Sequence, residues 1–423
     1  MNTKIAIIGA GISGISVAKL LKEIGCDVIV FEKEKQIGGL VKCSIEGNVL
    51  FHRVGGHVFN TRIQKVDDWF WRNFNKDKEF VLTKRNAQIW MNNNYIGYPI
   101  ENYLYKLNGT QISKIISELL LINSLVSKDI KRNENIDNFD NFLKSNFGNT
   151  LYELYFKPYN YKLWQTELTS IPLPWLEDKL PMPKVSDIFL NNITKKEEQN
   201  MVHSSFFYPL KGGSSFIVEK LSNNICIERN SDINLIQYIE NKWKINEKFY
   251  DSVIFTGDVR TLHDIIQIND QNVINCCNKV KHLISNGTSN ALCYVDDSDL
   301  SWLYLPELNT KSHRIIFTGN FSPNNNSDKR LTCTVEFSGI VSEKKMKETL
   351  VNLPGNLKPI AFNNEPNSYV IQQMDTRSLI SNLKSSLKPY KFYLLGRFAE
   401  WEYYNMDKAI EAAINLTENS FKI

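Results

Sequence analysis

The sequence lacks the spacings that mark metal-binding and disulfide-bonded proteins. Its 423 residues include seven cysteines and six histidines, but no CxxC pair and no HxxxH or HExxH arrangement. We therefore expect no metal site. An odd number of scattered cysteines is typical of free thiols in a reducing compartment.

Long apolar runs and a strong charge of one sign are also absent. No uninterrupted apolar segment reaches about 18 residues, the least that a transmembrane helix needs. The first strand-like run begins at Lys4, which leaves no room for a signal peptide. With 50 basic and 46 acidic residues the net charge is only +4, too little to indicate nucleic-acid binding. We expect a cytoplasmic protein with no nucleic-acid partner and no integral membrane association.

The N-terminal segment has the glycine pattern of a dinucleotide site. An apolar run ending at Ile8 precedes Gly9-Ala10-Gly11-Ile12-Ser13-Gly14, and Glu32 follows the next apolar run. Gly9 permits a tight turn, Gly11 lets the backbone approach a pyrophosphate, and Gly14 lets a helix pack on the strand. Glu32 is placed to accept hydrogen bonds from a ribose.

A second glycine pair indicates which cofactor binds. Gly38-Gly39 comes soon after Glu32, between Lys33 and Leu40. Flavoproteins need such a pair where the chain passes close to the extended FAD pyrophosphate, whereas nicotinamide dehydrogenases do not. We expect FAD as a resident cofactor, with a simple Gly-Gly turn as the alternative.

The remaining pattern indicates a dinucleotide domain assembled from both ends of the chain, with other segments inserted. Helical spacing runs from about Asn108 to about Leu154, strand-like alternation covers 290–338, and a buried strand ends at Gly257. We expect Asn324-Asn325-Asn326 to form an exposed turn.

Motifs along nearly the whole chain resemble those of the UDP-galactopyranose mutases, flavin-dependent members of the amine-oxidase superfamily. The most specific is Gly396-Arg397-Phe398-Ala399-Glu400-Trp401-Glu402-Tyr403-Tyr404-Asn405-Met406. The other matching segments are the FAD fingerprint from Gly9 to Gly39, Gly55-Gly56-His57-Val58-Phe59-Asn60-Thr61, Tyr98-Pro99-Ile100-Glu101-Asn102, Tyr159-Asn160-Tyr161-Lys162-Leu163-Trp164, Val253-Ile254-Phe255-Thr256-Gly257 and Val335-Glu336-Phe337-Ser338.

The resemblance implies an α/β fold in which a Rossmann-type FAD-binding domain carries an inserted helical domain and an antiparallel β-sheet domain. The expected segments are 1–80, 196–265 and 381–423 for the FAD-binding domain, 81–105 and 266–380 for the sheet, and 106–195 for the helical substrate domain.

The resemblance also implies an isomerase that interconverts the pyranose and furanose forms of a nucleotide sugar, with no net redox change, for surface polysaccharide biosynthesis. Reduced FAD is the active form, its N5 attacks the anomeric carbon, and NAD(P)H is the expected external reductant. The resemblance leaves open whether the protein forms a homodimer.

Site residues follow from the matching motifs. Arg397 and Tyr403 correspond to residues that contact the diphosphate, and a guanidinium suits this task because it binds phosphate oxygens in pairs. His57 is expected against the isoalloxazine edge. The implied substrate-binding residues are Asn102, Tyr159, Trp164, Arg314, Tyr369, Arg397 and Tyr403. The implied cofactor-binding residues are Gly9, Gly11, Ser13, Gly14, Glu32, Lys33, Gly38, Gly39, Leu40, Gly56, His57, Gly257, Gly396, Arg397, Asn405 and Met406.

Several positions depart from the mutase pattern. The family carries an arginine in a mobile loop, where this chain has Leu180-Pro181-Met182-Pro183-Lys184, so Lys184 supplies a point charge in place of a fork. Arg314 matches a second sugar-side arginine only loosely. Each residue also has a structural reading: Arg397 as a partner of a carboxylate, His57 as a core histidine, and the aromatic residues as ordinary core.

Two other functions remain compatible with the motifs. An FAD-dependent oxidoreductase of the protoporphyrinogen-oxidase or amine-oxidase type shares the flavin fingerprint, and a flavin-bound scaffold that has lost its sugar site is the non-catalytic alternative. Arg397 and Tyr403 in the signature segment favour the mutase.

Overall fold

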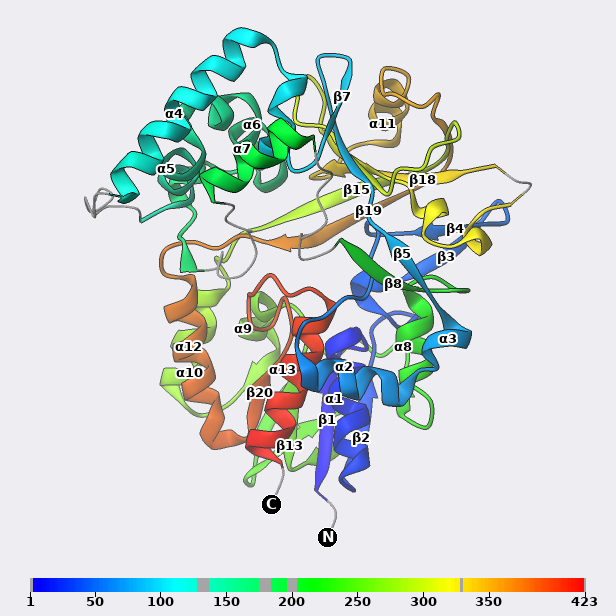
Figure 1. The fold of residues 1–423 in the computed structure, drawn as a ribbon. Coiled ribbons are helices and arrows are strands. Elements are labelled where there is room, and N and C mark those ends of the chain that lie inside the picture. The colour runs from blue at the N-terminus through cyan, green and yellow to red at the C-terminus, as the bar shows by residue number, and fades with distance from the viewer. Residues whose placement is uncertain (1–2, 128–136, 175–183, 196–203, 328–329, 422–423) are drawn as a thin grey trace.

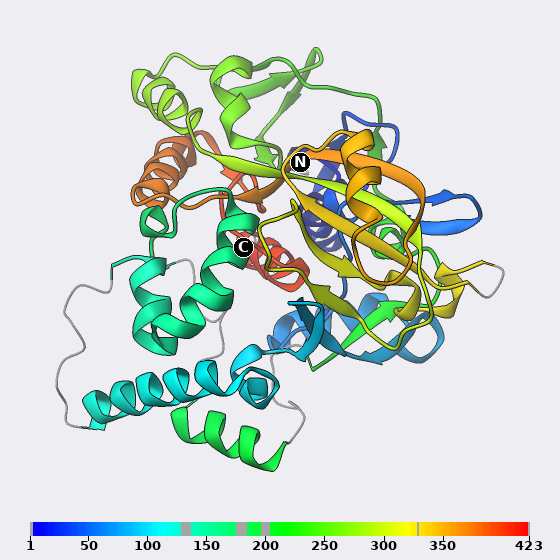
Figure 2. The same ribbon diagram turned by 90° about the horizontal axis from the view of Figure 1, so that it is seen from above.

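The computed structural model describes residues 3–127, 137–174, 184–195, 204–327 and 330–421. A group of helices lies above a large sheet, and an α/β unit lies below it (Figure 1). The helical group and helix α11 (Glu343–Leu350) pack on opposite faces of the sheet, and the view from above shows them apart (Figure 2). Both termini lie at the far end of the α/β unit.

The α/β unit is built on a five-stranded parallel sheet in the order β20-β13-β1-β2-β9. These strands span Phe392–Leu394, Ser252–Phe255, Lys4–Ile8, Asp27–Phe31 and Cys226–Glu228, respectively. The first strand therefore lies beside strands from the middle and the end of the chain, and the expected assembly from both ends is confirmed.

Two layers cover this sheet because successive side chains of a strand point to opposite faces. Ile5 and Ile7 pack in one apolar cluster, whereas Ala6, Val253 and Phe255 pack in another. The helices over the first face are α1 (Ile12–Glu23), α2 (Gln64–Asn73), α8 (Ser215–Leu221) and α13 (Met406–Ser420). The second face carries β10 (Ile236–Ile239), β11 (Lys242–Ile245), β12 (Lys248–Tyr250), β14 (Ile266–Gln267), α9 (Leu262–Ile265), α10 (Gln271–Val280) and α12 (Thr376–Leu387).

A seven-stranded sheet spans the middle of the molecule in the order β19-β15-β18-β17-β16-β6-β7. All neighbouring strands are antiparallel except β16 and β6. The strands are β19 (Lys358–Val370), β15 (Ser285–Tyr294), β18 (Thr332–Ser338), β17 (Ser312–Ile316), β16 (Trp302–Tyr304), β6 (Ala87–Met91) and β7 (Asn94–Gly97). Ile316 faces the helical group while Ile315 packs on the other side.

The helical group is the expected insertion. It contains α4 (Gly109–Ser127), α5 (Phe139–Leu151), a π-helical turn (Tyr152–Phe156), α6 (Lys157–Trp164) and α7 (Val185–Thr194). Ile115, Leu119 and Leu143 are fully buried in one cluster with Trp302 and Tyr304 of the sheet. The insertion and the sheet thus share a core. The predicted α/β fold class is confirmed, whereas the domain limits remain a prediction.

Short elements connect these units. They are β3 (Cys43–Glu46) paired with β4 (Val49–His52), β5 (Phe80–Lys84) paired with β8 (Ser205–Pro209), and α3 (Lys76–Glu79). The turn between β6 and β7 contains Asn92 and Asn93 with φ of 52° and 58°, a pair of left-handed residues that suits a tight hairpin.

The prediction of an exposed turn at residues 324–326 is wrong for Asn325, the central residue. Asn325 is 1% exposed, and its Nδ2 donates to the Thr318 carbonyl and to the Tyr208 hydroxyl. Asparagine is common in turns, but here its amide satisfies buried acceptors, so its position is fixed by hydrogen bonding rather than by exposure.

The glycine turn after β1 leaves no room for side chains. A Cβ at Gly14 would lie 2.0 Å from the Gly9 carbonyl oxygen, and Gly9 itself has φ of 106°. A Cβ on Gly39 would lie 3.2 Å from the Gly11 Cα, because the second glycine pair lies against the first turn. Close packing of α1 on β1 therefore requires glycine at position 14.

Gly14→Ala should accordingly displace α1 from β1, lower the thermal unfolding midpoint and weaken FAD retention. Gly109→Ala is the matched control, since a Cβ there meets nothing within 4 Å. Thermal unfolding and flavin absorbance of the two purified variants provide the comparison. A Gly14→Ala protein that is as stable and as yellow as the control would contradict the packing argument.

Candidate functional site

A cavity of about 620 Å³ lies where the glycine turns, the end of β13 and the C-terminal signature segment meet. It also reaches Glu365 and Asn367 of β19. The predicted cofactor residues that line it are Gly9, Gly11, Ser13, Glu32, Lys33, Gly38, Gly39, Leu40, His57, Gly257, Arg397, Asn405 and Met406. Gly14, Gly56 and Gly396 are not part of this lining, but Gly14 and Gly396 pack closely against Gly9 and Ser13, which are.

The residues of this cavity suit a dinucleotide diphosphate. Gly11 caps α1 without a side-chain hydrogen bond, and Asn405 does the same for α13. The N-terminus of α1 therefore borders the cavity with uncapped N–H groups, an arrangement that favours anions, whereas at α13 the Asp407 carboxylate accepts from the Asp407 and Lys408 N–H groups. Glu32 is buried, and its two carboxylate oxygens accept hydrogen bonds from the backbone N–H groups of Ala10 (2.8 Å) and Glu34 (3.0 Å).

The signature segment closes the cavity from the C-terminal side. Gly396 has φ of 98°, and a Cβ there would lie 2.6 Å from the Ser13 hydroxyl oxygen. Its N–H donates to Glu400 at 2.8 Å. FAD therefore fits the donor set and the shape of this cavity: glycines where backbone must approach closely, an acid after β2 and the uncapped N-terminus of α1.

His57 presents a neutral imidazole to the cavity. Burial and the neighbouring Arg397 guanidinium lower the pKa of His57 to about 4. Its Nε2 is buried and has no hydrogen-bond partner among the described residues. A buried, unpaired ring nitrogen at the cavity wall is suited to meet a polar atom of a bound ligand.

A buried carboxylate organises the sheet beside His57. Glu336 of β18 is 1% exposed, and its Oε1 accepts hydrogen bonds from His313, Arg314 and Tyr369. These donors come from β17 and β19, on both sides of β18 and β15. The Arg314 guanidinium and the His313 hydrogen bond hold the pKa of Glu336 well below its usual range.

Gly55 brings the His57 segment against this carboxylate. It has φ of 65°, and a Cβ there would lie 2.3 Å from Glu336 Oε2 and 3.2 Å from Arg314 Nη2. The Gly55 N–H donates to Asn290 of β15. A side chain at this position would push His57 away from the sheet.

An aromatic wall connects the cavity to the helical insertion. Tyr403 stacks on Tyr369 with ring centroids 5.7 Å apart, and Trp164 meets both rings edge-on. Further along, Tyr159 meets Tyr304 edge-on at 5.5 Å. Tyr304 lies opposite Arg314 in the sheet register. The structure thus brings together the predicted substrate residues Tyr159, Trp164, Arg314, Tyr369 and Tyr403.

Arg397 joins the wall to the cavity. Its Nε donates to the Tyr404 carbonyl (3.1 Å), its Nη1 donates to the Ser368 carbonyl (3.0 Å), and its guanidinium lies 4.7 Å from the centre of the Tyr403 ring. No described carboxylate forms an ion pair with it, so its positive charge is not neutralised within the described part of the chain. The alternative reading of Arg397 as a carboxylate partner is therefore not what the structure has.

Two predicted residues lie away from this assembly. Lys184 is exposed at the N-terminus of α7 and lies on no wall of the FAD cavity, and residues 180–183 before it fall outside the described residues. Asn102 is buried just before the insertion, where its side-chain oxygen accepts from Asn191 of α7.

Sequence reasoning assigned no role to several residues of the site. Glu336 belongs to the motif Val335-Glu336-Phe337-Ser338. A single acidic residue in an otherwise uncharged strand is the pattern that could have indicated its role. Lys162 is also buried: its ammonium donates to the backbone carbonyls of Leu305, Glu307 and Ser312. Burial lowers the pKa of Lys162 to about 7. Only the three-dimensional fold reveals those acceptors.

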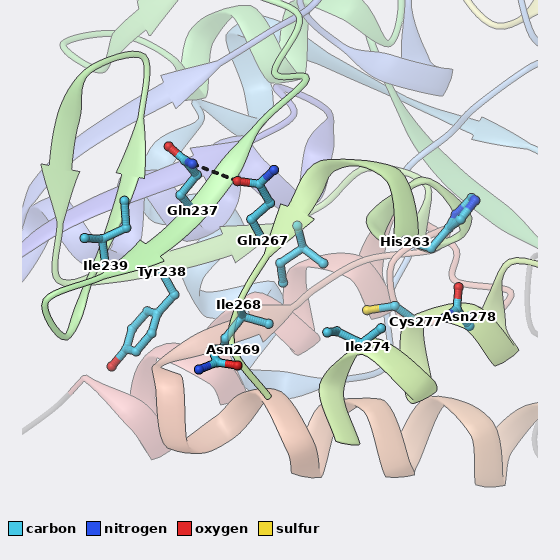
Figure 3. A pocket seen from close by; sticks show the side chains of 11 residues that line it. Gln237, Tyr238, Ile239, His263, Gln267, Ile268, Asn269, Ile274, Cys277 and Asn278 are labelled. Atoms are coloured by element: carbon cyan, nitrogen blue, oxygen red, sulfur yellow. Dashed lines mark hydrogen bonds between the residues drawn. The ribbon is translucent and has the colours of Figure 1, made fainter. Parts of the chain in front are cut away.

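Other cavities lie outside this assembly or at its edge. One of about 500 Å³ is bordered by Tyr403 and Tyr404 together with Arg377, Lys384 and Lys408. Another, of about 490 Å³, lies between β10, β14 and α10, where Gln237 donates to Gln267 at 2.7 Å (Figure 3). It contains none of the predicted site residues.

Comparison with known proteins first defines the class. The NAD(P)-binding Rossmann-like domain family matches residues 7–74. Among solved structures, wild-type putrescine oxidase bound to putrescine superimposes with a TM-score of 0.67 at 11% identity, covering 99% of each chain. The chain therefore shares its fold with this oxidase.

The mutases within this class match more closely. Reduced UDP-galactopyranose mutase superimposes with a TM-score of 0.88 at 19% identity, covering 100% of this chain and 97% of the other. UDP-galactopyranose mutase of Mycoplasma genitalium is 23% identical over 97% of this chain and 93% of its own. The dTDP-fucopyranose mutase of Escherichia coli is 29% identical over 42% of this chain and 46% of its own. The resemblance to the UDP-galactopyranose mutase family is confirmed along the whole chain, and with it the expected class of enzyme, an isomerase.

Three findings concern the cysteines, membrane-spanning helices and metal ligands. All seven cysteines are free thiols, as expected. Within the described ranges, no helix combines the length and apolar character needed to cross a membrane, and no three His, Cys, Asp or Glu side chains cluster as metal ligands would.

Because two of its histidines are buried, we expect the folded protein to lose stability in mild acid. Burial lowers the pKa of His52 to about 3 and that of His57 to about 4, whereas an imidazole in the unfolded chain titrates near about 6.5. As pH falls through this window the unfolded chain binds more protons than the folded chain, so the free energy of unfolding decreases. His52→Gln should lower by about one the number of protons that the chain takes up on unfolding in this pH range.

Thermal unfolding midpoints from about pH 6.5 down to about pH 4 measure the effect. The exposed His282 provides the control, and His282→Gln should leave the pH dependence as it is in the parent protein. The same slope in His52→Gln and the parent would show that His52 does not titrate differently on unfolding.

Proposed function

We propose that this chain is a flavin-dependent nucleotide-sugar mutase that interconverts pyranose and furanose forms in polysaccharide biosynthesis, with FAD working in its reduced state and NAD(P)H as the external reductant. The observation that carries the proposal is the position of Arg397, an unneutralised guanidinium shared by the FAD cavity and the aromatic wall. The names of the related mutases support a nucleotide sugar as the substrate.

The bound cofactor would supply the nucleophile, N5 of the reduced flavin, for attack on the anomeric carbon. The residues of the chain would bind and orient the substrate. Gly9, Gly11, Gly38 and Gly39 would admit the cofactor diphosphate close to backbone N–H groups, and Glu32 would face its ribose.

Arg397 would hold the diphosphate of the sugar nucleotide. Two backbone carbonyls, those of Ser368 and Tyr404, fix its guanidinium plane, and the remaining N–H groups can donate to phosphate oxygens. Such preorganised donors stabilise a departing anion more than water does, because they need no reorganisation as charge develops. Tyr403 and Tyr369 would flank the same group.

Arg314 would play a different part. Glu336 neutralises its charge and fixes its orientation, so it can position a sugar hydroxyl without adding a second net charge. His57 would remain neutral at physiological pH and offer its Nε2 to the cofactor or the sugar. The stacked rings of the wall would exclude water from the anomeric carbon.

Activity should depend on the flavin redox state. If N5 is the nucleophile, only the reduced form has the electron density to attack an anomeric carbon. Dithionite-reduced enzyme incubated with UDP- and dTDP-sugars should form an isomer, resolved by chromatography, while the flavin stays reduced. Oxidised enzyme serves as the control. Equal isomerisation by both forms would exclude this mechanism, and substrate-driven flavin reduction without an isomer would instead indicate an oxidoreductase.

Arg397→Ala should reduce turnover by about 10²-fold, the scale of losing one preorganised donor, while the protein still purifies with FAD. Arg397→Lys should recover only part of the activity, because one ammonium cannot span both carbonyls and a phosphate. Arg330→Gln, which removes a guanidinium lying 3.6 Å from the Tyr294 ring outside the site, is the control. Loss of FAD or of folding in Arg397→Ala, rather than loss of turnover, would make Arg397 a structural residue.

A further inference from the structure

Arg85, between β5 and β6, is a half-buried cation for which the described residues supply no counter-ion. Its Nη2 donates to the Tyr304 hydroxyl at 2.6 Å. Its Nε is buried and has no hydrogen-bond partner among the described residues. No described carboxylate forms an ion pair with it. A covered N–H group on a cation that no described anion offsets is stabilised when a ligand supplies the partner.

The neighbours of Arg85 fix its plane without neutralising it. The guanidinium lies 5.2 Å from the ring centres of both Tyr98 and Trp302. Burial raises the pKa of Tyr98 and holds that of Tyr159 well above its usual range, so these phenols stay neutral. Cation–π contacts of this kind orient a guanidinium and leave its N–H edge available for hydrogen bonding.

Arg85 lies where the aromatic wall meets the His57 segment. Tyr304, its hydrogen-bond acceptor, contacts Tyr159 and lies opposite Arg314 in the sheet. On its other side, Trp302 contacts Phe321 with ring centroids 5.0 Å apart, and a Cβ on Gly56 would lie 3.0 Å from that same phenylalanine ring. Arg85 thus contacts the substrate wall directly through Tyr304, and two rings, those of Trp302 and Phe321, lie between it and the loop of Gly56.

The opposite end of the wall already has its own cation. Arg397 lies at the Tyr403 end and would bind the diphosphate. A second unneutralised guanidinium, placed toward the His57 segment, is then positioned for the sugar rather than for the phosphates. A neutral hexose has no group that would offset it.

We propose that Arg85 is a specificity-determining residue that binds a carboxylate on the sugar, so that the substrate is a nucleotide-linked hexuronic acid. This inference rests on the proposed function. The free Nε and an Nη of one guanidinium can donate together to the two oxygens of a carboxylate, the geometry in which arginine binds such groups most strongly.

The test compares two sugars that differ only at C6. UDP-galacturonate carries a carboxylate there, and UDP-galactose carries a hydroxymethyl group. Dissociation constants are measured with the oxidised holoenzyme by calorimetry, so that binding is read without turnover, and isomer formation is measured separately with reduced enzyme. The variants are Arg85→Gln and Arg85→Lys, with Arg330→Gln as a guanidinium control.

The parent protein and Arg330→Gln should bind the uronate about 10-fold or more tightly than the neutral sugar, the scale of a charge-assisted hydrogen bond. Arg85→Gln should abolish this preference by weakening uronate binding alone, and Arg85→Lys should keep part of it. Thermal unfolding midpoints confirm that each variant is folded.

Three outcomes would overturn the inference: no uronate binding, a preference of the parent protein for the neutral sugar, or equal weakening of both sugars in Arg85→Gln. An isomer formed from UDP-galactose without any Arg85-dependent preference would leave the proposed function standing and remove the inference. Uronate binding that depends on Arg85, with no isomer from either sugar, would support the inference and remove the mutase assignment.

Discussion

The buried carboxylate of Glu336 is the contact on which the site depends. One oxygen accepts hydrogen bonds from side chains of β17 and β19, and the other lies so close to Gly55 that only hydrogen fits there. Removing a buried carboxylate that satisfies several donors leaves each of them unpaired, which is more unfavourable than the loss of any single bond. Arg314, Tyr369 and the His57 segment therefore hold their positions together.

A second buried polar contact orients the helical insertion. Apolar burial against Trp302 and Tyr304 provides much of its attachment, but such contacts tolerate sliding. The Lys162 ammonium adds a directional contact, because three carbonyls of the segment leading into β17 converge on it. Tyr159 and Trp164 lie on the same helix, so their placement over the sheet follows from this lysine.

The dinucleotide half could be predicted from the sequence because its constraints are local. Gly9, Gly14 and Glu32 act within one βαβ unit, where spacing translates directly into geometry. The substrate half depends on contacts between residues far apart in the chain, such as Arg85 with Tyr304 or Glu336 with Tyr369. Their partners are set by sheet register, which local patterns do not encode. The resemblance supplied Arg314 and Tyr369 but no reason for their orientation, and it pointed to Lys184, which lies elsewhere.

The segment that closes the cavity is synthesised long after the glycine turn that it meets. Gly396, Arg397 and Asn405 meet the turn formed by Ser13 and its neighbours, so nearly the full length of the chain separates the two walls of the cofactor cavity. On the ribosome, the N-terminal βαβ unit emerges long before its parallel neighbours β13 and β20. The sheet therefore has an unpaired edge until those strands are made, and the cavity takes its full shape only after the segment from Gly396 to Asn405 has packed against the glycine turn.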